Sequence, residues 1–158
     1  MDFVAESKIS NPVLESVLTA FRGDTELQLR AMSSTSCGIT IADARQTGCP
    51  LIYVNDAFVE VTGYTREESL GHSCRFLQGD DREQPGIHEV RRAIQTGEHC
   101  KALLRNYKKD GTFFWNELIM SPVHNERGEL THFVGVQTDV TEREVAKRAL
   151  VHKQTELE

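Results

Sequence analysis

Hydrophobic and polar positions follow two periods along this chain, and the period separates the expected strands from the expected helices. Runs rich in β-branched and aromatic residues predict five strands, at about 38–42, 51–54, 100–108, 112–123 and 130–140. Asp110-Gly111, between the third and fourth runs, is a strong hairpin signal. The last three strands are therefore expected to form an antiparallel meander.

The segment between the second and third strands carries apolar residues at helical spacing, interrupted by caps and glycines. Asn55 is expected to cap a first helix that Gly63 ends, and Thr65 begins a capping box for a second helix. A helical turn is expected at 74–78 and a longer helix at about 85–96. This order predicts an α+β fold, with one antiparallel five-stranded sheet and short helices on one face.

Two helical segments flank this core. Before it, Asn11 is expected to cap one helix, and a second short helix is expected at about 24–32. After it comes a polar helix with a sparse apolar seam of Ala146, Leu150 and Leu157, which indicates a linker or a short dimerising helix. The predicted division is an N-terminal extension at 1–35, a core at 36–140 and a C-terminal linker helix at 141–158.

The bulk composition narrows the class of protein. With 158 residues, 39% of them hydrophobic, the chain is the size of one globular domain. Its net charge of −6 and the lack of a long Lys/Arg run argue against direct nucleic-acid binding. No run of about 18 apolar residues predicts a membrane span. The first eleven residues do not resemble a secretory signal, so a cytoplasmic location is expected.

The four cysteines are Cys37, Cys49, Cys74 and Cys100. None belongs to a C-x-x-C pair or lies near paired histidines, so no metal site is expected. In a reducing cytosol they are thiols rather than disulfides. A single cysteine at a helix start is most often a small buried hydrophobe, so chemistry at any of them needs further support.

Three carboxamides provide the first chemical indication. With the period of two that strands impose, Asn106, Asn116 and Gln137 each fall on an apolar-rich face of one of the last three strands. A buried amide is costly unless it is hydrogen-bonded, and each offers donors and an acceptor. The imide edge of an isoalloxazine ring would satisfy all three. The alternative is that each amide caps a backbone group or points into solvent.

The segment Gly71-His72-Ser73-Cys74-Arg75-Phe76-Leu77-Gln78-Gly79 closely resembles the G-x-N-C-R-F-L-Q-G signature of the light-oxygen-voltage (LOV) family, the flavin-binding branch of the PAS family. The resemblance covers about residues 38–141. Further matching motifs are Tyr53-Val54-Asn55-Asp56-Ala57-Phe58, Thr62-Gly63-Tyr64, Val90-Arg91, Asn106-Tyr107, Asp110-Gly111, Phe114-Trp115-Asn116 and Gly135-Val136-Gln137. So many motifs in one order make the match specific, and it implies a PAS-like sheet.

The resemblance implies flavin mononucleotide (FMN) as cofactor and a role for each matching residue. Cys74 is similar to the thiol that bonds flavin carbon C4a under blue light, and Gln137 to the residue that senses protonation at N5. The other implied cofactor contacts are Arg75 and Arg91 at the phosphate, Gln78 at the ribityl chain, Asn106 and Asn116 at the imide edge, Ser73 beside the cysteine, and Leu77, Val90, Ile94, Leu118 and Phe133 as apolar walls.

Two departures from the family pattern touch these positions. His72-Ser73 stands where the family usually has Arg-Asn, so the side chain at Ser73 keeps a hydroxyl but loses the reach of an amide. Cys49-Pro50 stands where Asn-Pro is frequent, which removes another polar side chain. Both changes are expected to alter how the flavin is held or how fast its dark state recovers.

The sequence therefore predicts a blue-light photoreceptor module rather than an enzyme, with a homodimeric contact through the flanking helices and an effector domain as expected partners. Two alternatives remain open: a flavin or redox enzyme, and a light-insensitive PAS module that binds a metabolite or only dimerises. The motifs of serine hydrolases, zinc metalloproteases and dinucleotide-binding proteins are incomplete or absent. Arg75 replaces the last glycine of G-x-S-x-G, H-E-x-x-H lacks its second histidine, and no G-x-G-x-x-G occurs.

Overall fold

The computed structural model describes residues 25–157, and the chain divides into two compact units between Ser34 and Thr35. The described part of the first unit contains helix α2 (Thr25–Ser33), at the place where a second N-terminal helix was expected. The helix expected after Asn11 lies outside the described residues.

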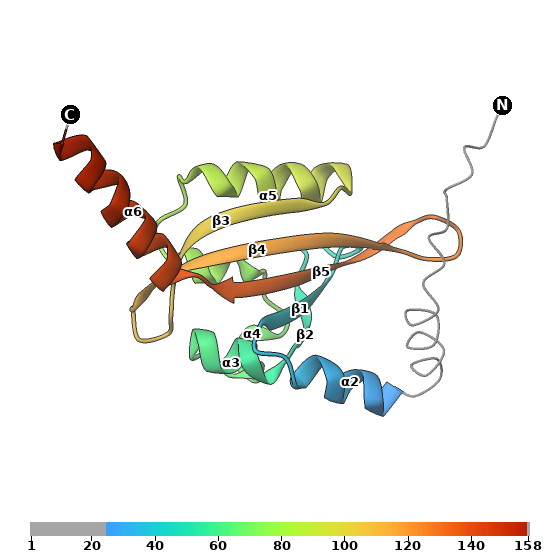
Figure 1. The fold of residues 1–158 in the computed structure, drawn as a ribbon. Helices are drawn as coiled ribbons and strands as arrows, with labels where there is room; N and C mark the ends of the chain where they lie inside the picture. The colour runs from blue at the N-terminus through green and yellow to red at the C-terminus, as the bar shows by residue number, and fades with distance from the viewer. Residues whose placement is uncertain (1–24, 158) are drawn as a thin grey trace, which may run out of the picture. The chain divides into compact units, whose positions relative to one another are not determined.

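The second unit is built on one five-stranded antiparallel sheet with strand order β2-β1-β5-β4-β3 (Figure 1). Its elements are β1 (Gly38–Asp43), β2 (Leu51–Val54), α3 (Asp56–Thr62), α4 (Arg66–Ser69), the 3₁₀ helix η1 (Cys74–Gln78), α5 (Pro85–Thr96), β3 (Cys100–Tyr107), β4 (Phe113–His124), β5 (Leu130–Asp139) and α6 (Thr141–Glu156). The predicted α+β fold class is confirmed.

Helix caps connect the short helices to the sheet. The Asn55 side chain accepts from the backbone N–H of Phe58, at 3.0 Å, and also from that of Ile39 on β1, at 2.8 Å. One buried amide therefore starts α3 and ties it to the sheet. Gly63 ends α3 in the left-handed region at φ 75°, a conformation that favours glycine.

Apolar side chains gather in three clusters under the helices. The first contains Leu51, Val54, Phe58 and Leu77, the second Ala93, Cys100, Met120 and Phe133, and the third Ile87, Ala102 and Leu104. Members of all three clusters also line one internal cavity. The core is thus interrupted by a binding-sized space rather than filled by side chains.

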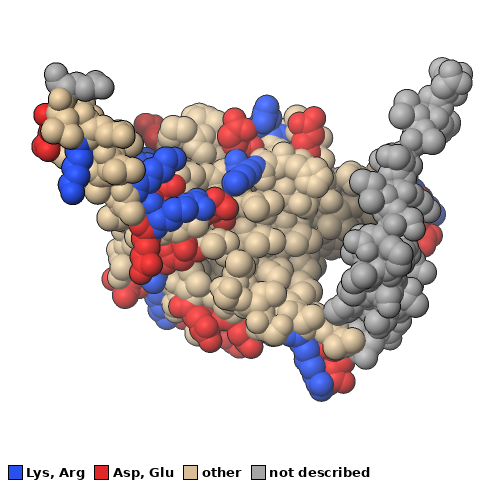
Figure 2. Space-filling view, viewed as in Figure 1, with Lys and Arg blue, Asp and Glu red and all other residues tan. Residues whose placement is uncertain are grey.

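Helix α6 is attached to the sheet at its first turns. The Trp115 N–H on β4 donates to the Thr141 hydroxyl at 3.0 Å, and the Trp115 carbonyl accepts from Val140 at 2.9 Å. Figure 2 shows charged side chains of both signs around the start of α6, while the middle of the same face is largely uncharged. Later apolar residues of the helix, such as Leu150, are exposed.

Within residues 25–157, no helix is long and apolar enough to cross a membrane. The same part of the chain contains no group of three or more His, Cys, Asp or Glu side chains placed to hold a metal ion.

Candidate functional site

A cavity of about 310 Å³ lies between the sheet, η1 and α5. This is the lower end of the size range of small-molecule sites. Its wall contains all the residues expected to contact a cofactor except Leu77: Ser73, Cys74, Arg75, Gln78, Val90, Arg91, Ile94, Asn106, Asn116, Leu118, Phe133 and Gln137. The fold thus brings together residues that are up to sixty-four positions apart in the sequence, from Ser73 to Gln137.

Leu77 is the one expected contact that does not line the cavity, and its role stays a prediction. Its side chain is 1% exposed and packs with Leu51, Val54 and Phe58. Cys74 and Leu77 are three positions apart in the 3₁₀ helix η1, so they share one side of it, and both pack against this cluster. Cys74 and Gln78 line the cavity, whereas Leu77 anchors the helix to the core beneath α3.

The three carboxamides lie on the same buried face and are joined in a chain across neighbouring strands. The Asn116 amide donates to Asn106 Oδ1 at 2.9 Å and to Gln137 Oε1 at 2.8 Å. Asn106 in turn donates to the Arg105 carbonyl at 2.9 Å, so one amide does also cap a backbone group. Asn116 Oδ1 is buried and has no hydrogen-bond partner among residues 25–157. A buried acceptor without a donor marks a place where a ligand N–H fits.

Cys74 begins η1 and faces the same amide chain. Its Sγ lies 3.5 Å from Gln137 Nε2. Burial raises the pKa of the Cys74 thiol to about 11, although the Gln137 amide lowers it somewhat. Cys74 as a whole residue is half-buried, and it lines the cavity. The thiol is therefore protonated at neutral pH.

Two guanidinium groups lie at the exposed edge of the cavity. Arg75 and Arg91 both line it, and neither forms an ion pair with any residue in the described part of the chain. The adjacent Arg92 differs, because it is paired with Glu89 at 2.7 Å. Two unpaired guanidinium groups at the rim of an otherwise apolar and amide-lined cavity suit a phosphate-bearing ligand.

The residues present fit a flavin on observations of this structure. The orphaned Asn116 oxygen requires a donor, which the N–H of an imide edge supplies. Gly135 lines the cavity, and a Cβ atom added there would lie 2.6 Å from the Thr40 hydroxyl, so a larger side chain would have to displace Thr40. The wall at this point is flat backbone, which favours a planar ring.

Both departures from the family motif face the cavity. The Ser73 hydroxyl accepts from the Arg75 N–H at 3.5 Å, so it caps η1. Cys49 lines the cavity in the left-handed region at φ 48°, the single non-glycine residue with positive φ in the described chain. Burial raises the pKa of the Cys49 thiol as well.

Several wall residues were not among the predicted contacts: Thr40, Ala42, Gly48, Leu51, Ile87, Leu104, Met120 and Gly135. The period of two would have found Leu104, Met120 and Gly135, since each shares a face with a predicted amide. Thr40 carries no such signal, because it reaches the cavity only through the pairing of β1 with β5.

Comparison with known proteins agrees with this geometry. The PAS domain family matches residues 36–142. A blue-light photoreceptor from Listeria monocytogenes serovar 1/2a is 42% identical over 130 residues, which are 82% of this chain and 51% of that protein. The structure of an RNA-binding light-oxygen-voltage receptor is similar with a TM-score of 0.76 at 37% identity, over 98% of this chain and 41% of that one. The LOV domain of a blue-light-activated histidine kinase from Erythrobacter litoralis is similar with a TM-score of 0.63 at 40% identity, over 66% of this chain and 96% of that one.

The fold and the site define a sensory module, and the chain belongs to the PAS family, in its light-oxygen-voltage branch. It is a light-sensing module, and its similarity to blue-light receptors implies a flavin chromophore. The chain spans about half the length of the Listeria receptor, at 51%.

One expectation about partners is not supported. Net charge and the lack of a long Lys/Arg run argue against direct nucleic-acid binding, yet a structural neighbour aligned over 98% of this chain is described as an RNA-binding receptor. Net charge reports the whole surface and not a local one, so the exclusion of a nucleic-acid partner is withdrawn.

Proposed function

We propose that this chain is a blue-light photoreceptor module that binds FMN and forms a reversible bond between Cys74 and flavin carbon C4a. The observation that carries the proposal is the convergence of three features on one cavity: a protonated thiol, a chain of buried amides with an unused acceptor, and unpaired arginines at the rim.

Each end of the cavity suits one part of FMN. Asn106, Asn116 and Gln137 would hydrogen-bond the polar edge of the ring, and Gln78 the ribityl chain. Arg75 and Arg91 would bind the phosphate, which riboflavin lacks. Val90, Ile94, Leu118 and Phe133 would enclose the ring, and Ser73 would contact it beside Cys74.

The proposed bond needs no external oxidant or reductant. With FMN bound, the Cys74 sulfur would add to C4a and the thiol hydrogen would go to N5, so the S–H bond and the π bond between C4a and N5 would be exchanged for a C–S and an N–H bond. Illumination supplies the energy, and the reverse elimination restores both partners in the dark. The chain's own contribution is to hold the thiol protonated and close to Gln137, at 3.5 Å.

The signal is proposed to leave through β5. Protonation turns N5 from an acceptor into a donor, and the Gln137 amide can respond by presenting its oxygen. Gln137 is four residues before Thr141, where α6 begins. We therefore propose that α6 is the output element. The proposed division of the chain is an extension at 1–35, a core at 36–140 and a C-terminal linker helix at 141–158.

Partners are proposed on the same basis. The exposed apolar residues Val145 and Leu150 of α6, with Leu157 directly after the helix, suit a parallel helix pair in a homodimer. An effector domain attached to such a module is a second proposed partner, since the Erythrobacter LOV domain comes from a histidine kinase. Sedimentation of the chain in darkness and under blue light tests the first of these, and a monomer in both conditions would reject it.

The deciding experiment is the absorption spectrum of the purified protein before and after blue light. A flavin band that bleaches and returns in the dark is expected, and FMN should be the released flavin. A colourless protein would instead favour a light-insensitive PAS module. Steady turnover of an added reductant, with no bleaching, would favour a redox enzyme.

A further inference from the structure

A buried glutamine outside the cavity joins helix α5 to the edge strand β3. Gln84 is 2% exposed and precedes α5, but its side chain makes no capping bond to that helix. It binds the Arg105 peptide on both sides: its Oε1 accepts from the Arg105 N–H at 2.6 Å, and its Nε2 donates to the Arg105 carbonyl at 2.9 Å. Gln84 also donates to the Asp81 carbonyl at 2.8 Å.

The Arg105 carbonyl has a second donor, and that donor belongs to the cavity. Asn106 Nδ2 donates to the same oxygen at 2.9 Å. A carbonyl oxygen has two lone pairs and accepts both bonds. Two hydrogen bonds therefore connect an amide that lines the cavity to the residue at which α5 begins. Asn106 and Gln84 are both almost fully buried, so water does not replace these bonds.

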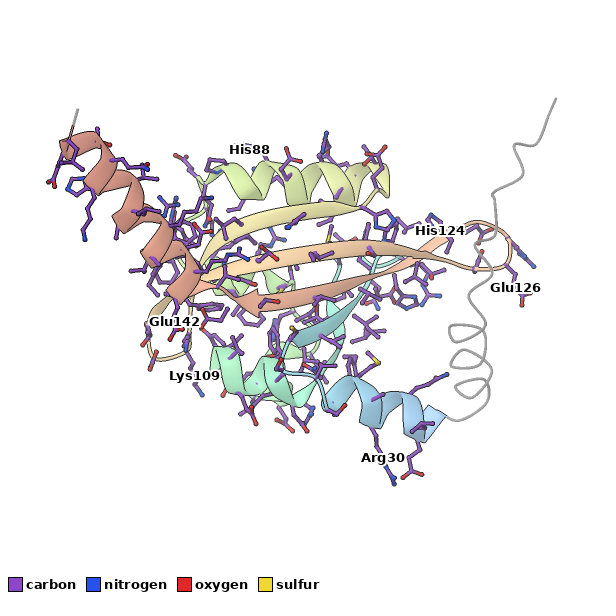
Figure 3. The ribbon with its side chains drawn as sticks, in the orientation of Figure 1. Arg30, His88, Lys109, His124, Glu126 and Glu142 are labelled. Atoms are coloured by element: carbon purple, nitrogen blue, oxygen red, sulfur yellow. The ribbon has the colours of Figure 1, made fainter. Side chains whose placement is uncertain are left out.

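The start of α5 has no space to move independently of β3. A Cβ atom added to Gly86 would lie 2.5 Å from the Leu103 carbonyl oxygen, so helix and strand touch through their backbones. The same helix presents Val90 and Arg91 to the cavity, while Figure 3 shows His88 on its outer side. A small displacement at Gln84 or Gly86 thus changes where the Arg91 guanidinium lies.

The outer side of the joint is held by a charged anchor. Arg105 forms two hydrogen bonds to the Asp81 carboxylate, at 2.7 and 2.9 Å, and the Tyr107 hydroxyl donates to the same group at 3.0 Å. The segment between η1 and α5 is therefore fixed to β3 by the Asp81 carboxylate and by the Gln84 amide.

We infer that Gln84 is a positioning residue that couples the two ends of the flavin site. The ring end is held by Asn106, and the phosphate end by Arg91 on α5; Gln84 connects them through the Arg105 peptide. The inference rests on the proposed binding of FMN. It requires that a ligand at the ring end stiffens the start of α5, and that loss of Gln84 weakens phosphate binding selectively.

The test compares FMN with riboflavin, which differ only in the phosphate. Dissociation constants of both are measured for the parent chain, Gln84→Met and Gly86→Ala. Gln84→Met keeps the side-chain length without its hydrogen bonds, and Gly86→Ala moves the helix by a steric route. In each variant the preference for FMN over riboflavin should fall about tenfold, the loss expected of one charge-assisted bond.

A matched control separates positioning from general loss of stability. Thr62→Val removes a buried hydroxyl that donates to the Phe58 carbonyl at 2.8 Å in α3, which does not line the cavity. This variant should lose stability and keep the FMN preference. In the parent, riboflavin should also slow hydrogen exchange in the first turn of α5, and in Gln84→Met it should not.

The outcomes distinguish failure of the proposed function from failure of the inference about Gln84. A parent chain that binds neither flavin rejects the proposed function and this inference with it. A parent that prefers FMN, with the same preference in Gln84→Met and Gly86→Ala, rejects the inference alone. Should Gln84→Met fail to fold, Gly86→Ala decides, because it displaces the start of α5 without changing the Gln84 side chain.

Discussion

The Cys74 thiol sets the chemistry that this site can perform. Burial raises its pKa to about 11, so almost no thiolate exists at neutral pH. Cysteine nucleophiles that react in the dark usually have a lowered pKa. A thiol held protonated beside an amide is inert until its partner is activated, which suits a photochemical switch and does not suit a redox enzyme.

Replacing Cys74 tests its assignment directly. Cys74→Ala removes the sulfur from the wall but leaves the amides and arginines, so the protein should still bind FMN and fluoresce. It should no longer bleach reversibly under blue light. Cys49→Ala is the matched control, since Cys49 is the other thiol on the cavity wall, and it should bleach normally. Normal bleaching of Cys74→Ala would refute the assignment.

The raised pKa also predicts a flat pH profile. Because the reacting species is the thiol, the yield of the bleached state should change little between about pH 6 and about pH 9. A reaction through the thiolate would instead rise roughly tenfold for each pH unit below the pKa. The initial bleaching rate at constant light intensity measures this. A steep rise with pH would show that the thiolate reacts.

The arginines at the rim should control which flavin is bound. Arg75→Ala with Arg91→Ala should weaken FMN binding by at least about a hundredfold, since each guanidinium contributes a charge-assisted bond to the phosphate. Riboflavin binding should change far less. Arg92→Ala is the control, because Arg92 is already paired with Glu89. Unchanged FMN occupancy in the double variant would contradict the assignment.

Sequence reasoning at the residue scale succeeded where a local rule applied. Asn106, Asn116 and Gln137 could be placed on one buried face because the period of two holds along each strand. Leu77 could not, since a motif match does not say which way a side chain points within a short 3₁₀ turn. Gln84 was missed because its partner, Arg105, is twenty-one residues away, and no local pattern marks such a pair.

At the scale of elements, the ends of helices could be predicted from the sequence better than the pairing between distant strands. Asn55 and Gly63 fix the ends of α3 through local hydrogen bonds and backbone preference. The sheet order could not be predicted, because β5 pairs with β1, about a hundred residues earlier, and lies between β1 and β4. That pairing brings Gln137 beside Thr40 and beneath Cys74, so it builds the site.

Helix α6 is held by contacts that its apolar seam did not suggest. The Arg148 guanidinium lies 4.5 Å from the Trp115 ring centre, and Arg143 forms an ion pair with Glu117 at 2.7 Å. Glu144, rather than a residue of the apolar seam, is the buried side chain of this helix. Exposed ion pairs contribute about 0–1 kcal/mol and cation–π contacts at the surface about 0.5–1 kcal/mol. The helix is therefore attached weakly enough for a change at β5 to shift it.

Gln137→Leu tests the route from the flavin to α6. Leucine fills similar space but cannot exchange donor for acceptor, so the variant should bleach and yet transmit less change to the helix. Hydrogen exchange of residues 141–157 in dark and light is the measurement. The parent should lose protection at the start of α6 under light, and Gln137→Leu should lose less. Equal protection in both states of the parent, or an undiminished response in the variant, would reject this route.

Across the whole molecule, several carboxylates are stabilised by arginine partners. Arg45, Arg105 and Arg143 lower the pKa values of Asp43, Asp81 and Glu117 respectively, chiefly through side-chain hydrogen bonds. A carboxyl whose pKa is lower in the folded state adds stability above its unfolded pKa. That stability is lost as the pH falls towards the folded value. The Asp81–Arg105 pair joins the loop before α5 to β3, and the Glu117–Arg143 pair joins β4 to α6. Acid should therefore weaken both attachments.

The free energy of unfolding should therefore fall as the pH drops below about 4–5, where carboxyls in the unfolded chain begin to bind protons. Asp81→Asn should be less stable than the parent at pH 7. It should also lose less stability on acidification, because the variant lacks the carboxyl whose pKa is lower in the folded than in the unfolded chain. Urea unfolding at pH 7 and at about pH 4 measures both effects. Asp80→Asn is the control, since Asp80 forms no ion pair with the described residues and its removal should leave the stability at pH 7 nearly unchanged. If Asp81→Asn and the parent lose equal stability between these pH values, the Asp81–Arg105 pair does not contribute to acid sensitivity.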